Sequence, residues 1–415
     1  MRDRLNILWV TPMPPSPPRF GGQARMHGLL TATAASHDVT AIALCEPAFD
    51  RAASEVAMRA YSPAARAVAS PNHSEGPRKR ALQLRSLLSL RSYEDIRYAV
   101  PALQAAIDEA CARTRFDVVN VEFPYLMRYA FRAPGGAPPP PVVLDTHEIE
   151  YDILRQFAAS QSGAFRKVYN AFNWRKLRGE ERGAFRTAAG VAVCSVDDER
   201  RVQADAPGAR TVVVPNGANV EYFRPRPEDP PCDGKTILFF GTFGYYPNVD
   251  GVLFFLKEIW PRIAASSADA RLKIVGLRPP PEIKAFEGPR VEVAGFVEDL
   301  RPHLASAAVL IAPLRMGGGT RLKILEGMSM ARPCVSTTLG AEGIEATPGR
   351  DLLLADAPDA FADAVLRLLR EPDVAAEMGR AGRRLAEERY SWRAASERLV
   401  GLFRSAIEAG VRRAA

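Results

Sequence analysis

The chain has 415 residues, of which 47% are hydrophobic and 25% charged, and 55 Lys and Arg residues stand against 48 Asp and Glu. This length suggests two or three domains, and the composition excludes a largely disordered protein, a coiled coil and a collagen-like fibre. The net charge of +7 is small for so long a chain and by itself requires no nucleic acid and no membrane as a partner.

Short runs rich in Val, Ile and Leu alternate with longer segments of helical pattern. We expect strands at 6–11, 38–44, 116–122, 142–146, 190–195 and 211–215, and again at 235–241, 271–276, 291–296, 308–314, 333–338 and 351–355. Helices are expected over 94–114, 151–187, 249–265, 320–330, 358–370, 373–388 and 392–413. Continuously apolar strands separated by helices are typical of parallel sheets that are covered on both faces.

This pattern predicts an α/β protein of two Rossmann-like, doubly wound domains that face a cleft. We place the first domain at 1–215 and the second at 216–390, and we interpret 221–234, rich in Pro and charge, as a linker. The last helix, in 391–415, has no strand after it and is expected to pack back on the first domain. Ligands of such sheets bind at the carboxyl ends of the strands.

The N-terminus and the cysteines favour the cytoplasm. The apolar run from Ile7 to Val10 is too short for a signal-peptide core, and no stretch approaches the roughly 18 apolar residues of a transmembrane helix. The five cysteines are scattered without metal-ligand spacing, as expected for free thiols in a reducing compartment.

Two motifs of the first half follow expected strands. Gly21 and Gly22 come after the first strand, where they form either a ligand-binding loop or a simple strand-to-helix turn. His147 lies in the sequence DTHEIE at the end of the strand 142–146, where cleft residues are found. Its alternative is a helix-entry loop in which Asp145 or Thr146 acts as a cap.

Between these motifs lies a basic segment that runs from Arg78 to Arg91, RKRALQLRSLLSLR, with five leucines and no acidic residue. One interpretation is an amphipathic helix that lies on anionic lipid. The other is a surface helix that packs on its own domain.

The most informative segment is APLRMGGGTRLKILEGMSMARPCVST, residues 312–337. Three glycines let the backbone approach an anion, and Thr320 is expected to cap the following helix. The helix N-terminus adds positive potential, to which Arg321 and Lys323 add charge. Lys323 and Glu326 are three residues apart and share a helix face. The arrangement suits a diphosphate with a neighbouring ribose, although a flexible turn with solvated charges remains the alternative.

These motifs occur in the order of a known family. GFV at 295–297, PL at 313–314, GGGT at 317–320, KILEGM at 323–328, PCV at 333–335 and GAEGI at 340–344 together resemble the donor-binding half of GT-B glycosyltransferases. The closest resemblance is to the large retaining family 4, also called glycosyl transferases group 1. VPNG at 214–217 resembles the family's domain junction, and FGTFGYYPN at 240–248 resembles the start of its second domain.

The resemblance implies transfer of a sugar from a nucleotide diphospho-sugar to an acceptor hydroxyl, with retention and without a metal or other cofactor. Arg321 and Lys323 would neutralise the diphosphate, and His147 would face the donor sugar or position the acceptor. The implied donor-binding residues are Gly21, Gly22, Gly244, Asn248, Gly318, Gly319, Thr320 and Glu326. The implied setting is polysaccharide or glycoconjugate synthesis, with a saccharide or lipid-linked acceptor and peripheral contact with the inner membrane face.

The sequence departs from the family at two points. The family often has two glutamates eight residues apart, but the position eight before Glu326 is Gly318, and the Arg often found in the 241–248 loop is missing. The alternatives are therefore a non-catalytic GT-B subunit that binds a partner glycosyltransferase, or another GT-B enzyme such as a sugar-nucleotide epimerase or an inverting transferase. Nucleic acid is not an expected partner, because no aromatic-plus-basic module is recognisable.

Overall fold

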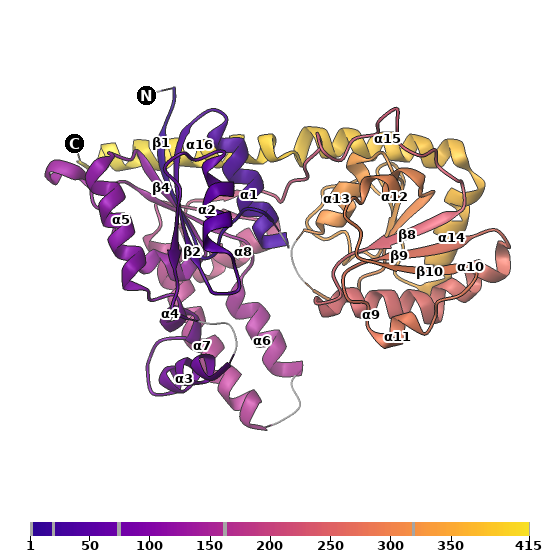
Figure 1. Ribbon diagram of the computed structural model, residues 1–415, viewed down its shortest axis with the longest axis horizontal. Coiled ribbons are helices and arrows are strands. Elements are labelled where there is room, and N and C mark those ends of the chain that lie inside the picture. The colour runs from indigo at the N-terminus through magenta and orange to yellow at the C-terminus, as the bar shows by residue number, and fades with distance from the viewer. Residues whose placement is uncertain (1–2, 19–20, 73–75, 161–163, 318–319, 415) are drawn as a thin grey trace. The chain divides into compact units, whose positions relative to one another are not determined.

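The computed structural model describes residues 3–18, 21–72, 76–160, 164–317 and 320–414, and the chain divides into two compact units (Figure 1). Unit 1 comprises Met1–Pro215 and Ala395–Ala415, and unit 2 comprises Asn216–Ala394.

Unit 1 is built on a parallel sheet with the strand order β3-β2-β1-β4-β5-β6-β7. Its strands are β1 (Asn6–Thr11), β2 (Asp38–Cys45), β3 (Arg66–Ala69), β4 (Val118–Glu122), β5 (Val142–Thr146), β6 (Gly190–Val193) and β7 (Thr211–Val213). Its helices are α1 (Gly21–Ala34), α2 (Arg51–Arg59), α3 (Gly76–Leu87), α4 (Tyr93–Arg97), α5 (Pro101–Arg113), η1 (Pro124–Arg128), η2 (Pro134–Gly136), α6 (Glu150–Ser160), α7 (Ala164–Thr187) and α8 (Val196–Asp205).

Unit 2 repeats this arrangement with the order β10-β9-β8-β11-β12-β13. Its strands are β8 (Thr236–Phe240), β9 (Arg271–Val275), β10 (Val291–Gly295), β11 (Val309–Ala312), β12 (Cys334–Ser336) and β13 (Leu353–Leu354). Its helices are α9 (Tyr246–Phe254), the π-helical turn η3 (Phe255–Ile259), α10 (Trp260–Ser266), α11 (Pro281–Lys284), α12 (Arg301–Ser306), α13 (Leu322–Ser329), α14 (Pro358–Arg370) and α15 (Pro372–Arg389).

The two strand orders confirm the predicted pair of Rossmann-like sheets. Each sheet grows outward from its first strand in both directions, so the order reverses between β1 and β4 in unit 1 and between β8 and β11 in unit 2. Ligands of doubly wound sheets bind at such a reversal, beyond the carboxyl ends of the strands. β4 and β11 are buried over their whole length, as the continuous apolar runs predict for strands covered on both faces.

Several predicted elements have different limits in the structure. The helix expected over 94–114 is divided into α4 and α5, because Pro101 begins α5 and the preceding Val100 is extended. The helix expected over 249–265 is likewise interrupted by the π-helical turn η3. The four-residue edge strand β3, which pairs with β2, is not among the predicted strands.

The C-terminal helix α16 (Trp392–Ala414) belongs to unit 1 from Ala395 onward. Its Phe403 ring packs edge-on against Trp9 of β1, with ring centroids 6.2 Å apart. The segment 221–234 is not a free linker, which corrects the prediction. Asp233 N–H donates to the carbonyl of Ser306 at 3.0 Å, and Arg301 lies over the Tyr222 ring, so the segment packs on unit 2.

Candidate functional site

Those predicted donor-binding residues of unit 2 that the structure describes lie around the carboxyl ends of β8 and β11. These neighbouring strands are followed by the loops 241–245 and 313–321, and α13 begins directly after the second loop. Because the two strands are parallel, both loops leave the sheet at the same edge, where the strand order reverses.

Lys323 is held in this region by neutral groups. Its Nζ donates to Oδ1 of Asn248 at 2.8 Å and lies 4.1 Å from the centroid of the Phe239 ring. The Asn248 side chain is itself fixed, because its Nδ2 donates to the carbonyl of Thr242 at 2.7 Å. No carboxylate in the described part of the chain forms an ion pair with Lys323. The ammonium is therefore oriented but keeps its charge available for an anion.

Burial makes this ammonium easy to deprotonate. The pKa of Lys323 is lowered from 10.5 to about 7, first by desolvation and then by repulsion from Arg321, with Glu326 acting in the opposite direction. Burial also raises the pKa of Glu326 from 4.5 to about 7. Strongly shifted groups of this kind cluster at functional sites.

Two glycines allow the loops to come this close. A Cβ built on Gly241 would lie 2.9 Å from both Nζ of Lys323 and Nδ2 of Asn248. Gly317 has a φ of +104°, and its Cβ would lie 2.5 Å from the Tyr245 hydroxyl. A side chain at Gly241 would displace Lys323 and Asn248, and one at Gly317 would displace the Tyr245 hydroxyl.

The structure changes the expectation for the start of α13. Arg321, not Thr320, is the N-cap residue, and it makes no side-chain cap hydrogen bond. The Thr320 hydroxyl is buried and has no hydrogen-bond partner within the described residues. Arg321 is 7% exposed. Gly318 and Gly319 lie outside the described residues, and Gly244 belongs to the loop after β8, with its N–H 3.4 Å from the Thr242 hydroxyl.

Strand register in unit 1 creates a second buried polar cluster. Trp9 of β1 pairs with Asn120 of β4, and Glu122 of β4 pairs with Asp145 of β5, so these side chains share one face of the sheet. Oε1 of Glu122 accepts from Nε1 of Trp9 at 2.6 Å, and Oε2 lies 2.7 Å from Nε2 of His147.

Arg25 of α1 neutralises the other carboxylate of this cluster. Its Nη2 lies 2.6 Å from Oδ1 of Asp145, and both side chains are almost fully buried. Its Nη1 also donates to the carbonyl of Val214. Asp145 therefore does not cap α6, and the Thr146 hydroxyl donates to the carbonyl of Glu148 instead. Neither Asp145 nor Thr146 therefore acts as the cap that the helix-entry alternative expected.

The N-terminus of α6 is bound by a different residue. Glu181 of α7 accepts the backbone N–H groups of Glu150 and Tyr151 at 3.1 and 3.2 Å. Burial raises the pKa of Glu181 to about 8.

Burial sets the protonation of the His147 pair. It lowers the pKa of His147 from 6.5 to about 3 and raises that of Glu122 from 4.5 to about 7, while Arg25 lowers the pKa of Glu122. His147 is therefore a neutral imidazole near neutral pH, and its two ring nitrogens have different hydrogen-bonding roles.

The backbone next to Glu122 is strained. Phe123 has φ 72° and ψ 145°, a conformation that costs a bulky residue about 1 to 3 kcal/mol. Its N–H donates to the carbonyl of Asp145 at 2.9 Å, and its ring centroid lies 4.3 Å from that of His147. Strain of this kind concentrates at functional sites.

Glu122, Asp145 and His147 are close enough to share a metal ion, with ligand atoms within 4.8 Å of one another. The site fits a metal poorly, because Arg25 already pairs with Asp145 and Trp9 already donates to Glu122. The prediction of a metal-free reaction remains a prediction.

The two predicted glycines of unit 1 do not form a loop. Gly21 and Gly22 are the first residues of α1, a position that tolerates glycine because first-turn N–H groups lack helical acceptors. His147, Gly21 and Gly22 lie in unit 1, and the other predicted site residues lie in unit 2.

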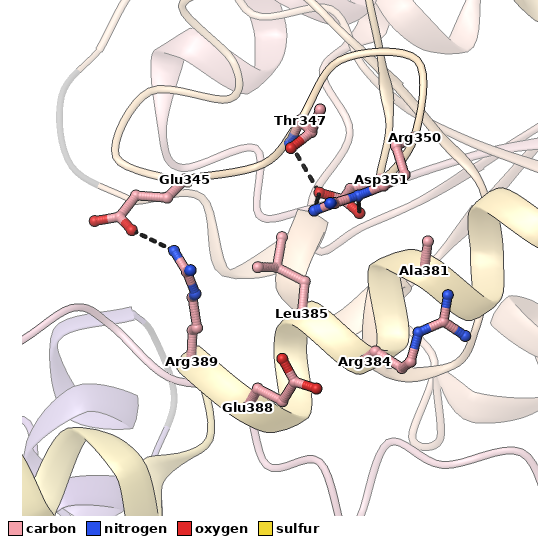
Figure 2. Close-up of a pocket in the computed structure, with 9 residues that line it drawn as sticks. All are labelled: Glu345, Thr347, Arg350, Asp351, Ala381, Arg384, Leu385, Glu388 and Arg389. Carbon is pink, nitrogen blue, oxygen red and sulfur yellow. Dashed lines mark hydrogen bonds and ion pairs between the residues drawn. The ribbon is translucent and has the colours of Figure 1, made fainter.

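A separate cavity in unit 2, of about 440 Å³, contains none of the predicted site residues (Figure 2). It is lined by Glu345, Thr347, Arg350, Asp351, Ala381, Arg384, Leu385, Glu388 and Arg389. Figure 2 shows that many of its charged groups pair with one another. Arg389 pairs with Glu345 at 2.7 Å, and Arg350 pairs with Asp351 at 2.8 Å.

The basic segment 78–91 packs on its own unit, as one of its two interpretations expects, and its contact with lipid stays a prediction. It includes most of α3, and Lys176 of α7 donates to the carbonyls of Ser86 and Ser89, so the segment packs on its own unit. Leu88 and Leu90 are nonetheless 86% and 93% exposed. In the part of the chain that the structure describes, no helix has the length and apolar character needed to span a membrane.

Comparisons with known proteins place both units in one class. A family model for Glycosyltransferase Family 4 matches residues 21–222, and a model for Glycosyl transferases group 1 matches residues 234–371. The chain is 30% identical over 223 residues to a phosphatidyl-myo-inositol mannosyltransferase of Mycobacterium leprae, a match that spans 52% of this chain and 59% of the relative.

A Corynebacterium glutamicum relative is 27% identical over 214 residues, which are 46% of this chain and 55% of that protein. It is named as a GDP-mannose-dependent monoacylated alpha-(1-6)-phosphatidylinositol monomannoside mannosyltransferase. The chain thus spans only a little over half the length of these two relatives.

Solved structures share the fold over nearly the whole chain. A sucrose-phosphate synthase from Thermosynechococcus elongatus matches with a TM-score of 0.70 at 18% identity, covering 98% of this chain and all of that one. The Anabaena protein HepE, solved with UDP-glucose, matches with a TM-score of 0.63 at 13% identity, covering 97% of this chain and all of HepE. At these identities the similarity concerns the fold.

Proposed function

We propose that this chain, which belongs to the GT-B glycosyltransferases, transfers a sugar from a nucleotide diphospho-sugar to an acceptor hydroxyl with retention of configuration. The observation that carries the proposal is the partly buried Lys323, oriented by an amide and a ring and without an ion-pair partner among the described residues. Arg321 precedes it at the start of α13. The leaving group of the proposed reaction is a nucleoside diphosphate, and we propose that these two cations bind it.

Catalysis then comes mainly from positioning and electrostatics. Lys323, Arg321 and the N–H groups at the start of α13 stabilise the negative charge that develops on the diphosphate as the glycosidic bond breaks. Asn248 keeps the Lys323 ammonium in place, and Glu326 accepts hydrogen bonds from the ribose hydroxyls. His147 bonds a hydroxyl of the donor sugar or of the acceptor. The chemistry as proposed needs no metal ion.

The acceptor that we propose is a saccharide or a lipid-linked molecule in polysaccharide or glycoconjugate synthesis. The names of the mycobacterial and corynebacterial relatives describe mannosyl transfer to phosphatidylinositol lipids. In this chain, the exposed Leu88 and Leu90 beside the arginines of the segment 78–91 support peripheral contact with an anionic membrane surface. The free cysteines, four of them buried, fit a cytoplasmic location.

Gly318 supports a second candidate. Because a glutamate often occupies this position in the family, its absence favours a non-catalytic GT-B subunit that keeps a nucleotide site and binds a partner glycosyltransferase.

A panel of nucleotides tests the proposal. UDP, GDP, ADP, dTDP and CMP are added to the wild type and to Arg321→Ala/Lys323→Ala, and the thermal midpoint is measured. At about 100 times its dissociation constant a ligand adds about 2.7 kcal/mol of stability, which raises the midpoint by several degrees. The matched control is Arg350→Ala/Arg384→Ala, which removes two positive charges from the other cavity of unit 2.

We expect one diphosphate to stabilise the wild type and the control but not the Arg321/Lys323 variant. Release of that diphosphate from its sugar nucleotides, followed by NMR of the product anomer, then tests transfer and retention. Stabilisation without turnover would favour the non-catalytic subunit, and a diphosphate that stabilises all three proteins equally would contradict the assigned site.

A further inference from the structure

We infer that Glu122 is a positioning residue that fixes the tautomer of His147, so that Nδ1 of the imidazole is presented to substrate as a hydrogen-bond acceptor. This inference rests on the proposed function, in which His147 bonds a sugar hydroxyl. It adds a residue that neither the sequence motifs nor the comparisons identify.

The neighbours of Glu122 determine which hydrogen bonds each of its two carboxylate oxygens can form. Nε1 of Trp9 lies 2.6 Å from Oε1, and Nδ2 of Asn120 lies 3.3 Å from the same oxygen. An indole N–H and an amide NH₂ can only donate. Oε1 must therefore accept from both groups, which leaves Oε2 to face Nε2 of His147 at 2.7 Å.

The proton between Glu122 and His147 belongs on the imidazole when the carboxylate is ionised. Burial raises the pKa of Glu122 to about 7, so the carboxylate is mostly ionised above this pH, and Arg25, which pairs with the neighbouring Asp145, favours the ionised form. The donors of Trp9 and Asn120 favour the same form. Nε2 then carries the hydrogen and donates it to Oε2. A neutral imidazole with hydrogen on Nε2 has a lone pair on Nδ1.

The imidazole ring also packs against an aromatic neighbour. Phe123, the residue directly after Glu122, places its ring centroid 4.3 Å from that of His147 at an interplanar angle of 44°. It does so from a backbone with a φ of 72°, which its N–H supports by donating to the Asp145 carbonyl. Consecutive residues therefore fix the imidazole by a hydrogen bond and by ring packing.

Nδ1 is the ring atom that remains for substrate. No hydrogen bond joins it to any residue within the described ranges. It lies beyond the carboxyl end of β5, the neighbour of β4, and the strand order of the unit 1 sheet reverses between β1 and β4. An Nδ1 that accepts from a sugar hydroxyl orients that hydroxyl without taking its proton, because the imidazole stays neutral.

The variant Glu122→Gln gives opposite predictions for a positioning role and for a merely structural one. In this variant the amide oxygen must still accept from Trp9 and Asn120, so the amide NH₂ faces Nε2 of His147. Nε2 then has to accept, and the ring hydrogen moves to Nδ1. The substitution keeps the size of the side chain but reverses the hydrogen-bonding role of Nδ1.

NMR of protein labelled with ¹⁵N-histidine measures directly which ring nitrogen of His147 carries the hydrogen. The ¹⁵N shifts distinguish protonated from unprotonated ring nitrogens, and a His147→Gln variant identifies the His147 signals among the five histidines. At a pH well above 7, where Glu122 is ionised, we expect hydrogen on Nε2 in the wild type and on Nδ1 in Glu122→Gln. The matched control is Trp9→Phe, which removes a different hydrogen bond to the same carboxylate and should keep the wild-type tautomer.

Activity completes the test. Turnover of the sugar nucleotide should fall about 10- to 100-fold in Glu122→Gln, as expected for a misplaced binding group, while the KM for the donor changes less than about threefold. An unchanged tautomer in Glu122→Gln, or a changed tautomer with normal turnover, would overturn the inference. A wild type that has the expected tautomer but transfers no sugar would overturn the proposed function and leave the effect of Glu122 on His147 standing.

Discussion

Replacing Lys323 by Met should separate nucleotide binding from the stability of unit 2. Methionine has a similar length but carries no charge. The pKa of Lys323 is lowered from 10.5 to about 7 because burial strips water from the ammonium and Arg321 repels it. This difference corresponds to a penalty on the charged form of the order of 4 to 5 kcal/mol. At neutral pH the wild type therefore gains no stability from the charge itself.

The sign of the pH dependence follows from this pKa. Between pH 7 and 10.5 the unfolded chain binds more protons at Lys323 than the folded one does. The free energy of unfolding therefore rises with pH across this window through this residue. In Lys323→Met this contribution disappears, and we expect the variant to be at least as stable as the wild type at pH 7. Urea unfolding at several pH values measures both effects.

Binding of a diphosphate should reverse the deprotonation. At about pH 8.5 most Lys323 side chains are neutral, and a neighbouring diphosphate favours the ammonium, so binding takes up close to one proton. Calorimetry in two buffers of different ionisation enthalpy measures this uptake. In Lys323→Met the uptake should vanish and affinity should fall about 10- to 100-fold, as expected for the loss of a hydrogen bond from a charged group.

Lys284→Met, at an exposed lysine of the same unit, is the control for loss of one charge. A Lys323→Met variant that is clearly less stable than the wild type, yet binds the diphosphate normally and with the same proton uptake, would refute the reasoning. Lys323 would then be a structural residue.

Two further predictions concern a glycine and a buried carboxyl. Gly241→Ala places a methyl group 2.9 Å from Nζ of Lys323. Calorimetry should therefore show diphosphate binding weakened about tenfold, a loss of the order of 1.4 kcal/mol, and unchanged affinity would contradict the packing. Burial raises the pKa of Glu181 from 4.5 to about 8, so the folded state binds more protons there and stability falls as pH rises between these values. In Glu181→Gln urea titrations should show a flatter fall, and an identical slope would mean that the carboxyl is ionised in the fold.

The strands were predictable because the sheets are parallel and covered on both faces. β4 and β11 are buried throughout, and such strands appear in a sequence as unbroken apolar runs. β3 escaped this criterion because its sequence RAVA begins with an exposed arginine and has only four residues. The break between α4 and α5 was signalled by Pro101, whose ring disfavours a helical conformation in the residue before it.

The sites were predictable only where their residues are close in sequence or follow neighbouring strands. Arg321 and Lys323 belong to one segment, and Asn248 follows the adjacent strand, so a motif can identify them together. Glu122 and Trp9 meet through the register of β1, β4 and β5, which places residues more than a hundred positions apart in hydrogen-bond distance. A single sequence contains no spacing rule for such a contact, although a carboxylate at the end of an apolar strand is a local signal for Glu122.

The buried cations of the two units have different partners. Arg25 in unit 1 pairs with a carboxylate, whereas Lys323 in unit 2 contacts neutral groups. Arg25 and Asp145 neutralise each other at 2.6 Å, so neither can turn to a ligand without leaving a buried charge behind. Lys323 instead rests on the amide of Asn248 and the ring of Phe239. These partners orient the ammonium without cancelling its charge, so an incoming anion gains most of the attraction. We therefore expect a charged leaving group to bind the less deeply buried Lys323 rather than Arg25, which already has an ion-pair partner.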